Sequence, residues 1–260
     1  MTIIVGHLLA VAIGLSLGLI GGGGSILAVP ILVYVMGVSS KVAIAMSLAI
    51  VGTVSVIGAI PHWQQGNVNL KIAIAFIPSA MVGAFLGARI TALSFVTDTF
   101  QLICFGIIMA IASILLIRKG SRKKAPGNNK SEQKPQSFLQ SILQGLAIPL
   151  EAFGVGILTG FVGVGGGFLI VPTLVLLAGI PMKEAIGTSL VIIAANSASG
   201  FLGYISQVEV DWNLIFSFTL AASSGTLLGA YLTRFIKAKQ LQKGFGYFVL
   251  AVAFFVLIRR

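Results

Sequence analysis

The feature that most constrains this chain is its series of long apolar segments, among them residues 72–90 and 100–117, which carry almost no charge. A helix needs about 20 apolar residues to cross a hydrocarbon core of about 30 Å. Only 9% of all residues are charged, whereas soluble domains average about 25%. Because several such segments follow one another, the sequence predicts an all-α, polytopic helical bundle in the cell membrane.

The basic residues are concentrated in one hydrophilic stretch, residues 118–136, which holds seven of the 17 lysines and arginines. This stretch is also rich in Ser, Asn, Pro and Gly, the composition of a flexible linker. Short loops dense in Lys and Arg stay in the cytoplasm. The net charge of +11 is therefore explained by topology, and we expect no nucleic-acid partner. The predicted organisation is an N-terminal membrane repeat (1–117), a basic cytoplasmic linker (118–136) and a C-terminal membrane repeat (137–260).

An internal repeat relates the two parts that flank the linker. A shift of 142 residues aligns positions 14–94 with 156–236 without a gap, and 28 of the 81 pairs are identical. Chance would give about a tenth for this composition, so the repeat is real. Its most similar part pairs GLIGGGGSILAVPILV, from Gly18, with GFVGVGGGFLIVPTLV, from Gly160.

Each half contains about five apolar segments. They span 3–20, 25–37, 41–60, 70–92 and 100–117 in the first half, and 142–162, 168–179, 184–205, 212–233 and 244–258 in the second. The first segment lacks the basic start and the cleavage site of a signal peptide, so we expect a retained helix. The second segment of each half is too short to span a bilayer and is predicted to be a broken, tilted or re-entrant half-helix. The bundle then has roughly eight to ten helices.

The charges of matched loops indicate how the two halves face the membrane. The loop from Arg234 to Lys243 carries four basic residues, whereas the matching turn from Ile90 to Thr99 carries none. Opposite charge bias at matched loops is what inverted repeats require, so we favour the inverted arrangement. A parallel arrangement stays open, because inversion places Arg259 and Arg260 on the outer face.

Two glycine clusters, Gly21–Gly24 and Gly163–Gly167, interrupt apolar segments at matched places. Glycine weakens a helix by about 1 kcal/mol relative to alanine, so such a run should break it. A new helix that starts after a break presents unpaired N–H groups and the positive end of its dipole, which together form an anion site. The alternative is that the glycines only let helices pack closely. The expected substrate-binding residues of the clusters are Gly22, Gly23, Gly24, Ser25, Gly165, Gly166 and Gly167.

The third segments supply most of the polar groups inside the bundle, and four of them are added to the expected binding site: Ser47, Thr188, Ser189 and Asn196. Uncharged donors would hold an oxyanion without preventing its release. Asn196 and Ser189 lie two helical turns apart and therefore share a face. Ser and Thr often bond their own helix carbonyls instead, whereas an amide in hydrocarbon demands partners.

Glu151 is the one acidic residue predicted to lie within a membrane segment. A carboxylate there is costly and is functional by default, which makes Glu151 a candidate for proton coupling. Its position after Pro149, near the start of a segment, equally permits an interfacial residue at a helix N-terminus. His62, Trp63 and Tyr204 fall where the third segments end. Aromatic residues at such ends are expected in the interfacial belt, with a gating role as the alternative.

No catalytic or metal-binding pattern is visible in the sequence. His7 and His62 are the two histidines, Cys104 is the one cysteine, and neither a nucleophile elbow nor a Walker lysine follows the glycines. We therefore expect no metal, no cofactor and no enzymatic activity.

The duplicated element, GGGGSILAVP and GVGGGFLIVP, together with the downstream Ser-Leu pairs and the basic central linker, resembles the TauE/SafE family of sulfite exporters, also called TSUP. The resemblance covers nearly the whole chain, although the first copy has Ser25 where the second has Gly167. It implies a plasma-membrane permease for sulfur-containing anions such as sulfite or organosulfonates.

The expected function is secondary or facilitated transport of a small oxyanion, with protons as the candidate coupling ion. The anion would bind where the two glycine breaks meet and would be exposed alternately by rocking of the repeats. Two alternatives stay open: a permease for a cation or neutral solute, and a non-transporting membrane scaffold or subunit that binds partners through the linker.

Overall fold

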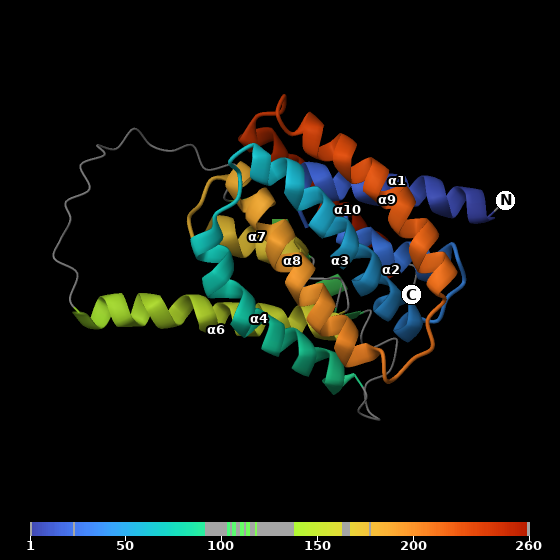
Figure 1. Ribbon diagram of the computed structural model, residues 1–260, viewed down its shortest axis with the longest axis horizontal. Helices are drawn as coiled ribbons and strands as arrows, with labels where there is room; N and C mark the ends of the chain where they lie inside the picture. Colours follow the sequence, from blue (N-terminus) through green and yellow to red (C-terminus); the bar gives the residue numbers. More distant parts are fainter. Residues whose placement is uncertain are drawn as a thin grey trace.

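The computed structural model describes residues 2–22, 24–91, 138–162, 167–176 and 178–258, with isolated residues between 103 and 118 (Figure 1). All regular structure in these residues is helical. The helices are α1 (Thr2–Ile20), α2 (Ser25–Tyr34), α3 (Ser40–Gln64), α4 (Leu70–Ile90), α6 (Phe138–Val162), α7 (Gly167–Leu176), α8 (Met182–Tyr204), α9 (Trp212–Leu232) and α10 (Ala238–Ile258).

Five of the described helices, α1, α3, α4, α8 and α9, are long and apolar enough to cross a membrane. Their outward faces are apolar as well, since Ile74 of α4 and Phe216 and Leu220 of α9 are more than half exposed. Lipid tails are as apolar as these side chains and cover them without penalty. The all-helical fold class predicted from the sequence is confirmed, and the chain fits a multi-pass membrane protein.

The helices begin and end close to the limits of the predicted segments. The short second segments of the two halves are α2 and α7, each of 10 residues. α6 and α10 start earlier than predicted, at Phe138 and Ala238, because the Gln, Lys and Leu residues that precede their apolar parts are good helix formers. The predicted segment 100–117 and the linker lie almost entirely outside the described residues. Re-entry of the short helices and inversion of the halves stay predictions.

The two halves are interlocked, because the first helix of each packs against the fourth helix of the other: α1 against α9, and α6 against α4. In Figure 1 the two pairs lie on opposite sides of the bundle, with α3 and α8 between them. Small residues permit the close approach. Gly14 of α1 lies against Ala222 of α9, and at the matched positions Gly156 of α6 lies against Ala80 of α4.

Side-chain contacts between the halves repeat in the same way. The Nε2 of Gln65, after α3, donates to the carbonyl of Ala230 in α9 at 3.3 Å. The Nε2 of Gln207, after α8, donates to the carbonyl of Ala88 in α4 at 3.3 Å. Donor and acceptor are both shifted by 142 positions between these two bonds. The aligned parts of the two halves therefore make matched contacts with each other.

The interior of the bundle is formed by α3 and α8, which pack along each other and are the most buried of the five long helices. α2 packs against α3, and α7 packs against α8. Apolar side chains such as Leu48, Val51, Leu190 and Ile193 fill most of this centre. Polar side chains are buried among them, and these are the candidates for a binding site.

Candidate functional site

The first glycine cluster separates α1 from α2. α1 ends at Ile20, Gly21 has a φ of +77°, and α2 begins at Ser25. A φ in this range strains residues that carry a Cβ, so the chain turns here at a glycine. No side chain caps the start of α2. The sequence prediction of a helix break at this place is confirmed.

The second cluster separates α6, which ends at Val162, from α7, which begins at Gly167. The two breaks touch: a Cβ added to Gly22 would overlap the backbone of Gly167, and a Cβ added to Gly167 would overlap Gly22. The N-termini of α2 and α7 therefore come together. Each helix N-terminus carries roughly half a positive elementary charge, so their convergence favours a negative guest. Gly23, Gly165 and Gly166 lie outside the described residues.

One face of α8 borders both breaks. A Cβ placed on Gly21 would lie 2.6 Å from the Oγ of Ser189, and one placed on Gly167 would lie 2.6 Å from the Cδ1 of Ile193. Ser189 and Ile193 are four residues apart and thus lie one above the other on the helix. Asn196 follows three residues later on the same side. The face of α8 on which Ser189 and Asn196 were predicted to lie is therefore the face that borders the breaks, through Ser189 and Ile193.

Asn196 is the most conspicuous polar residue of this face. Its side chain is 1% exposed, and neither its Nδ2 nor its Oδ1 has a hydrogen-bond partner among the described residues. A buried polar group left unpartnered costs about 1–3 kcal/mol. An amide that retains this cost in the centre of the bundle has the chemistry of a ligand-binding group, with two N–H donors and one carbonyl acceptor.

Two further serines, one on α3 and one on α8, are buried and unpartnered like Asn196 and were not among the predicted site residues. Ser55 of α3 and Ser197 of α8 are fully buried, and neither hydroxyl has a partner among the described residues. Ser197 lies next to Gly52 of α3, with its Cβ 3.0 Å from a Cβ built on that glycine. The two serines occupy matched positions of the repeat, which is the signal by which the sequence alone could have found them.

The other predicted hydroxyls donate to nearby backbone. Ser25 donates to the carbonyl of Gly22 at 2.7 Å, Ser47 to that of Ile44 at 2.8 Å, and Ser189 to that of Ile186 at 2.8 Å. The bond of Ser25 stabilises the first break, and those of Ser47 and Ser189 each lie within one turn of their helix, as is usual for hydroxyls within helices. The three serines can reach an anion only after their hydroxyls rotate.

Thr188 is engaged away from the breaks. Its Oγ1 accepts a hydrogen bond from the backbone N–H of Asn69 at 2.8 Å, and the Nδ2 of Asn69 donates to Glu184 at 2.6 Å. Asn69 also caps α4 by accepting from the N–H of Ile72. Thr188 therefore fastens the α3–α4 connection to α8, and its predicted role at the substrate stays without support from these contacts.

Glu151 lies near the middle of α6, because this helix begins at Phe138. The interpretation that Glu151 occupies a helix N-terminus is therefore wrong. Its side chain is half-buried, between the exposed Leu150 and the fully buried Ala152. Among the described residues no hydrogen bond or ion pair to its carboxylate is found, so its proposed part in proton coupling stays a prediction.

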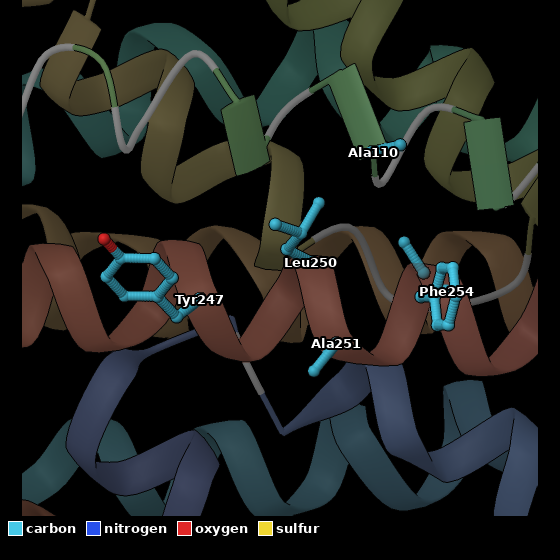
Figure 2. Close-up of a pocket in the computed structure, with 6 residues that line it drawn as sticks. Ala110, Tyr247, Leu250, Ala251 and Phe254 are labelled. Atoms are coloured by element: carbon cyan, nitrogen blue, oxygen red, sulfur yellow. The ribbon is translucent and has the colours of Figure 1, made fainter.

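Two apolar hollows open elsewhere on the bundle. One of about 450 Å³ runs along α10, where Leu250 and Phe254 lie on the side that faces Ala110 (Figure 2); its lining consists of Ala110, Tyr247, Leu250, Ala251, Ala253 and Phe254. The other, of about 480 Å³, lies between α4 and α6 and is lined by Pro78, Ser79, Val82, Pro149, Leu150 and Phe153. Neither lining includes a charged group or a residue of the breaks, so neither hollow is a candidate anion site.

The residues that end the third segments divide into two groups. Trp63 is 53% exposed, which suits an interfacial belt. His62 and Tyr204 are fully buried, so for these two the belt prediction is wrong. The Nε2 of His62 donates to the carbonyl of Gly18 at 2.9 Å, and the hydroxyl of Tyr204 donates to that of Phe161 at 3.2 Å. Both therefore hold the last turn of the helix that precedes a break.

The electrostatics of this site come from neutral groups. In the described part of the chain, the residues that border the breaks are serine, isoleucine and leucine, and no group of three His, Cys, Asp or Glu that could hold a metal ion is found. Binding of an anion here would rest on backbone N–H groups, helix dipoles and amide donors. Such neutral donors would bind an anion and still allow its release.

Two interlocked halves that make matched contacts, with helix breaks that touch each other, form an arrangement that suits a membrane transporter. The sequence model of the family described as "Sulfite exporter TauE/SafE" matches residues 7–256. This chain belongs to the TauE/SafE family of membrane transporters.

Known relatives are similar over most of their length. A "Probable membrane transporter protein" of Xylella fastidiosa (strain 9a5c) is 36% identical over 250 residues, which cover 95% of this chain and 92% of the relative. The "Probable membrane transporter protein YunE" of Bacillus subtilis (strain 168) is 30% identical over 89% of this chain and 90% of its own. YdhB of the same organism, under the same description, is 28% identical over 85% and 86%. No solved structure gives a significant match.

Proposed function

We propose that this chain is a permease for small sulfur-containing oxyanions, such as sulfite or organosulfonates, acting by secondary or facilitated transport. The family description, which names sulfite export, supports the substrate class. The observation that carries the proposal is the contact of Gly22 with Gly167, which brings the N-termini of α2 and α7 together against α8. The unpartnered amide of Asn196 follows on the same face of that helix.

In this mechanism the oxygens of the anion accept hydrogen bonds from the backbone at the two helix starts and from the Nδ2 of Asn196. A helix N-terminus stabilises an anion by about 0.3–1 kcal/mol when exposed and up to about 2 kcal/mol when partly buried. Two such ends and one amide would give modest affinity, which suits a substrate that must be released. Gly23, Gly24, Gly165 and Gly166 would complete the backbone cradle.

Access to the site requires the breaks to separate. Gly22 and Gly167 touch through their backbones, so an anion can enter between them only when α2 and α7 move apart. Rocking of one repeat against the other would open the site to either side in turn. The linker would lie in the cytoplasm, where its basic residues face anionic lipid.

A second candidate substrate is a monovalent cation. The Oδ1 of Asn196 and the hydroxyls of Ser55 and Ser197 are neutral oxygen atoms without partners among the described residues. Hard cations prefer such oxygen ligands. The polar centre of the bundle therefore offers both amide donors for an anion and oxygen acceptors for a cation.

Transport by purified protein in liposomes tests both. We expect uptake of labelled sulfite, thiosulfate or ethanesulfonate and no comparable uptake of sodium or rubidium. The variant Asn196→Val, which has the residue found at the matched position 54, should lose most of the anion flux. Cation uptake without anion uptake would replace the proposal by the second candidate, and unchanged anion flux in Asn196→Val would remove Asn196 from the site.

A further inference from the structure

His62 has one nitrogen that the fold uses and one that it does not. Its side chain is fully buried near the end of α3, and its Nε2 lies 2.9 Å from the carbonyl oxygen of Gly18. A carbonyl can only accept, so the Nε2 carries the hydrogen and the Nδ1 is the bare nitrogen of the neutral ring. The Nδ1 is buried and has no partner among the described residues.

The imidazole lies beside the first glycine break. Gly18, whose carbonyl it holds, is one turn before Gly21, and the same carbonyl accepts from the Oγ1 of Thr233 at 3.2 Å. On α8, a Cβ built on Gly187 would lie 3.1 Å from the Cβ of His62, while Ile186 and Ser189 border Gly21. A single turn of α8 thus contacts both His62 and the break.

The other half shows that this contact does not require a histidine. Tyr204, at the position matched to His62, is also fully buried and donates its hydroxyl to the carbonyl of Phe161 at 3.2 Å. Tyrosine supplies the hydrogen bond but does not titrate between pH 5 and 8, whereas histidine does. The acceptor in the second half lies one residue beyond the position matched to Gly18, so the two contacts are similar and not identical. The histidine adds a proton-binding group where the other half makes its contact with a tyrosine.

No ion pair to His62 is found among the described residues, and the charged side chains of the neighbouring elements have other partners. The described residues of α1 include no charged side chain. On α8, Lys183 donates to the carbonyl of Arg234, and Glu184 accepts from Asn69. On the α9 side, Arg234 lies over the ring of the exposed Tyr231, 5.7 Å from its centroid. A proton on the Nδ1 would therefore need a negative partner from outside the chain.

We propose that His62 is the proton-binding site that couples proton movement to anion transport, an inference that rests on the proposed function. The Nδ1 takes a proton from water on one side, which forms an N–H bond, and gives it back to water on the other, which breaks that bond; no other covalent bond of the protein changes. The anion at the first break supplies the negative charge that makes the buried imidazolium tolerable. Anion and proton thus cross together, and each favours the entry of the other.

The test uses liposomes that contain the purified full-length chain and a trapped pH-sensitive dye. The probes are labelled thiosulfate and ethanesulfonate, because neither changes its charge between pH 5 and 8. Three variants are compared: His62→Gln keeps an N–H donor for Gly18 but does not titrate, His62→Tyr copies the other half, and Glu151→Gln removes the carboxylate that the sequence predicts to lie within a membrane segment.

In the unmodified protein, anion uptake should acidify the lumen, and an acidic outside should drive accumulation of the probe. His62→Gln and His62→Tyr should still let the probe run down its own gradient, but without acidification or pH-driven accumulation. Glu151→Gln tests the other proton-coupling candidate: acidification lost in this variant and retained in both His62 variants would assign the coupling to Glu151 in place of His62. Anion uptake without acidification in the unmodified protein, or acidification retained in both His62 variants, overturns the role of His62 alone. Absence of uptake of either probe, or of sulfite, overturns the proposed function and this inference with it.

Discussion

Replacement of Asn196 by leucine should stabilise the protein and abolish transport at the same time. The amide is 1% exposed and its two polar atoms have no partner among the described residues, a situation that costs about 1–3 kcal/mol. Leucine has the same number and branching of side-chain heavy atoms, carries no polar atom and is a better helix former than asparagine. The free energy of unfolding should therefore rise by about 1–3 kcal/mol.

For a chain of this size, each kcal/mol corresponds to about 2–4 °C in Tm, so the Tm should rise by about 2–12 °C. Thermal unfolding in detergent, followed by tryptophan fluorescence, measures this shift. Leu190→Ala is the matched control: Leu190 lies on the same helix and is fully buried, so its truncation should cost about 2–5 kcal/mol and lower the Tm. The two variants thus move stability in opposite directions.

Binding of the anion gives a second readout. At a concentration 100-fold above Kd, a ligand adds about 2.7 kcal/mol to the stability of the protein that binds it. Sulfite or ethanesulfonate should therefore raise the Tm of the unmodified protein and leave that of Asn196→Leu unchanged. A leucine variant that is less stable than the unmodified protein and still transports would refute the reasoning, because it would show that the amide serves the fold and not the substrate.

Three further predictions concern the glycine contacts, the matched glutamines and the basic linker. Gly22→Ala should lower both yield and Tm, because its Cβ would overlap backbone of the other break, whereas Gly154→Ala in α6, where nothing lies within 4 Å, should raise stability by about 1 kcal/mol; circular dichroism melts compare the two. Gln65→Leu and Gln207→Leu should lower stability by similar amounts, about 1 kcal/mol each, since they remove matched bonds. Deletion of residues 123–134 should leave anion flux intact. Loss of function in a deletion variant that still folds would favour the scaffold alternative.

Much of the helical layout could be predicted from the sequence, because it depends on local properties. Apolar run length located the helices, and glycine density located the breaks at Gly21 and before Gly167. The start of α6 was placed too late, since its first four residues, 138–141, include two polar ones and lie beside the basic linker. This error made Glu151 seem close to a helix end, although it lies near the middle of α6.

The partners of individual polar groups could not be predicted, because they come from distant parts of the chain. Thr188 accepts from Asn69, which is 119 positions away, and His62 donates to Gly18 across 44 positions. Nothing in the local sequence distinguishes such a hydroxyl or imidazole from one that faces a substrate or the membrane interface. The repeat itself holds the missing information, since a contact made in one half is expected in the other.

The matched contacts also indicate which residues the fold can do without. Where both halves have the same residue, as at Gln65 and Gln207, the same bond is formed twice, and the need is structural. Where the halves differ, as with His62 and Tyr204, the tyrosine shows what the fold requires at that position, and the histidine shows what has been added to it. Asn196 is matched by a valine, so the fold accepts an apolar side chain there. The amide and the imidazole are therefore additions to the common frame: Asn196 lies on α8, the helix that borders the two breaks, and His62 packs against it.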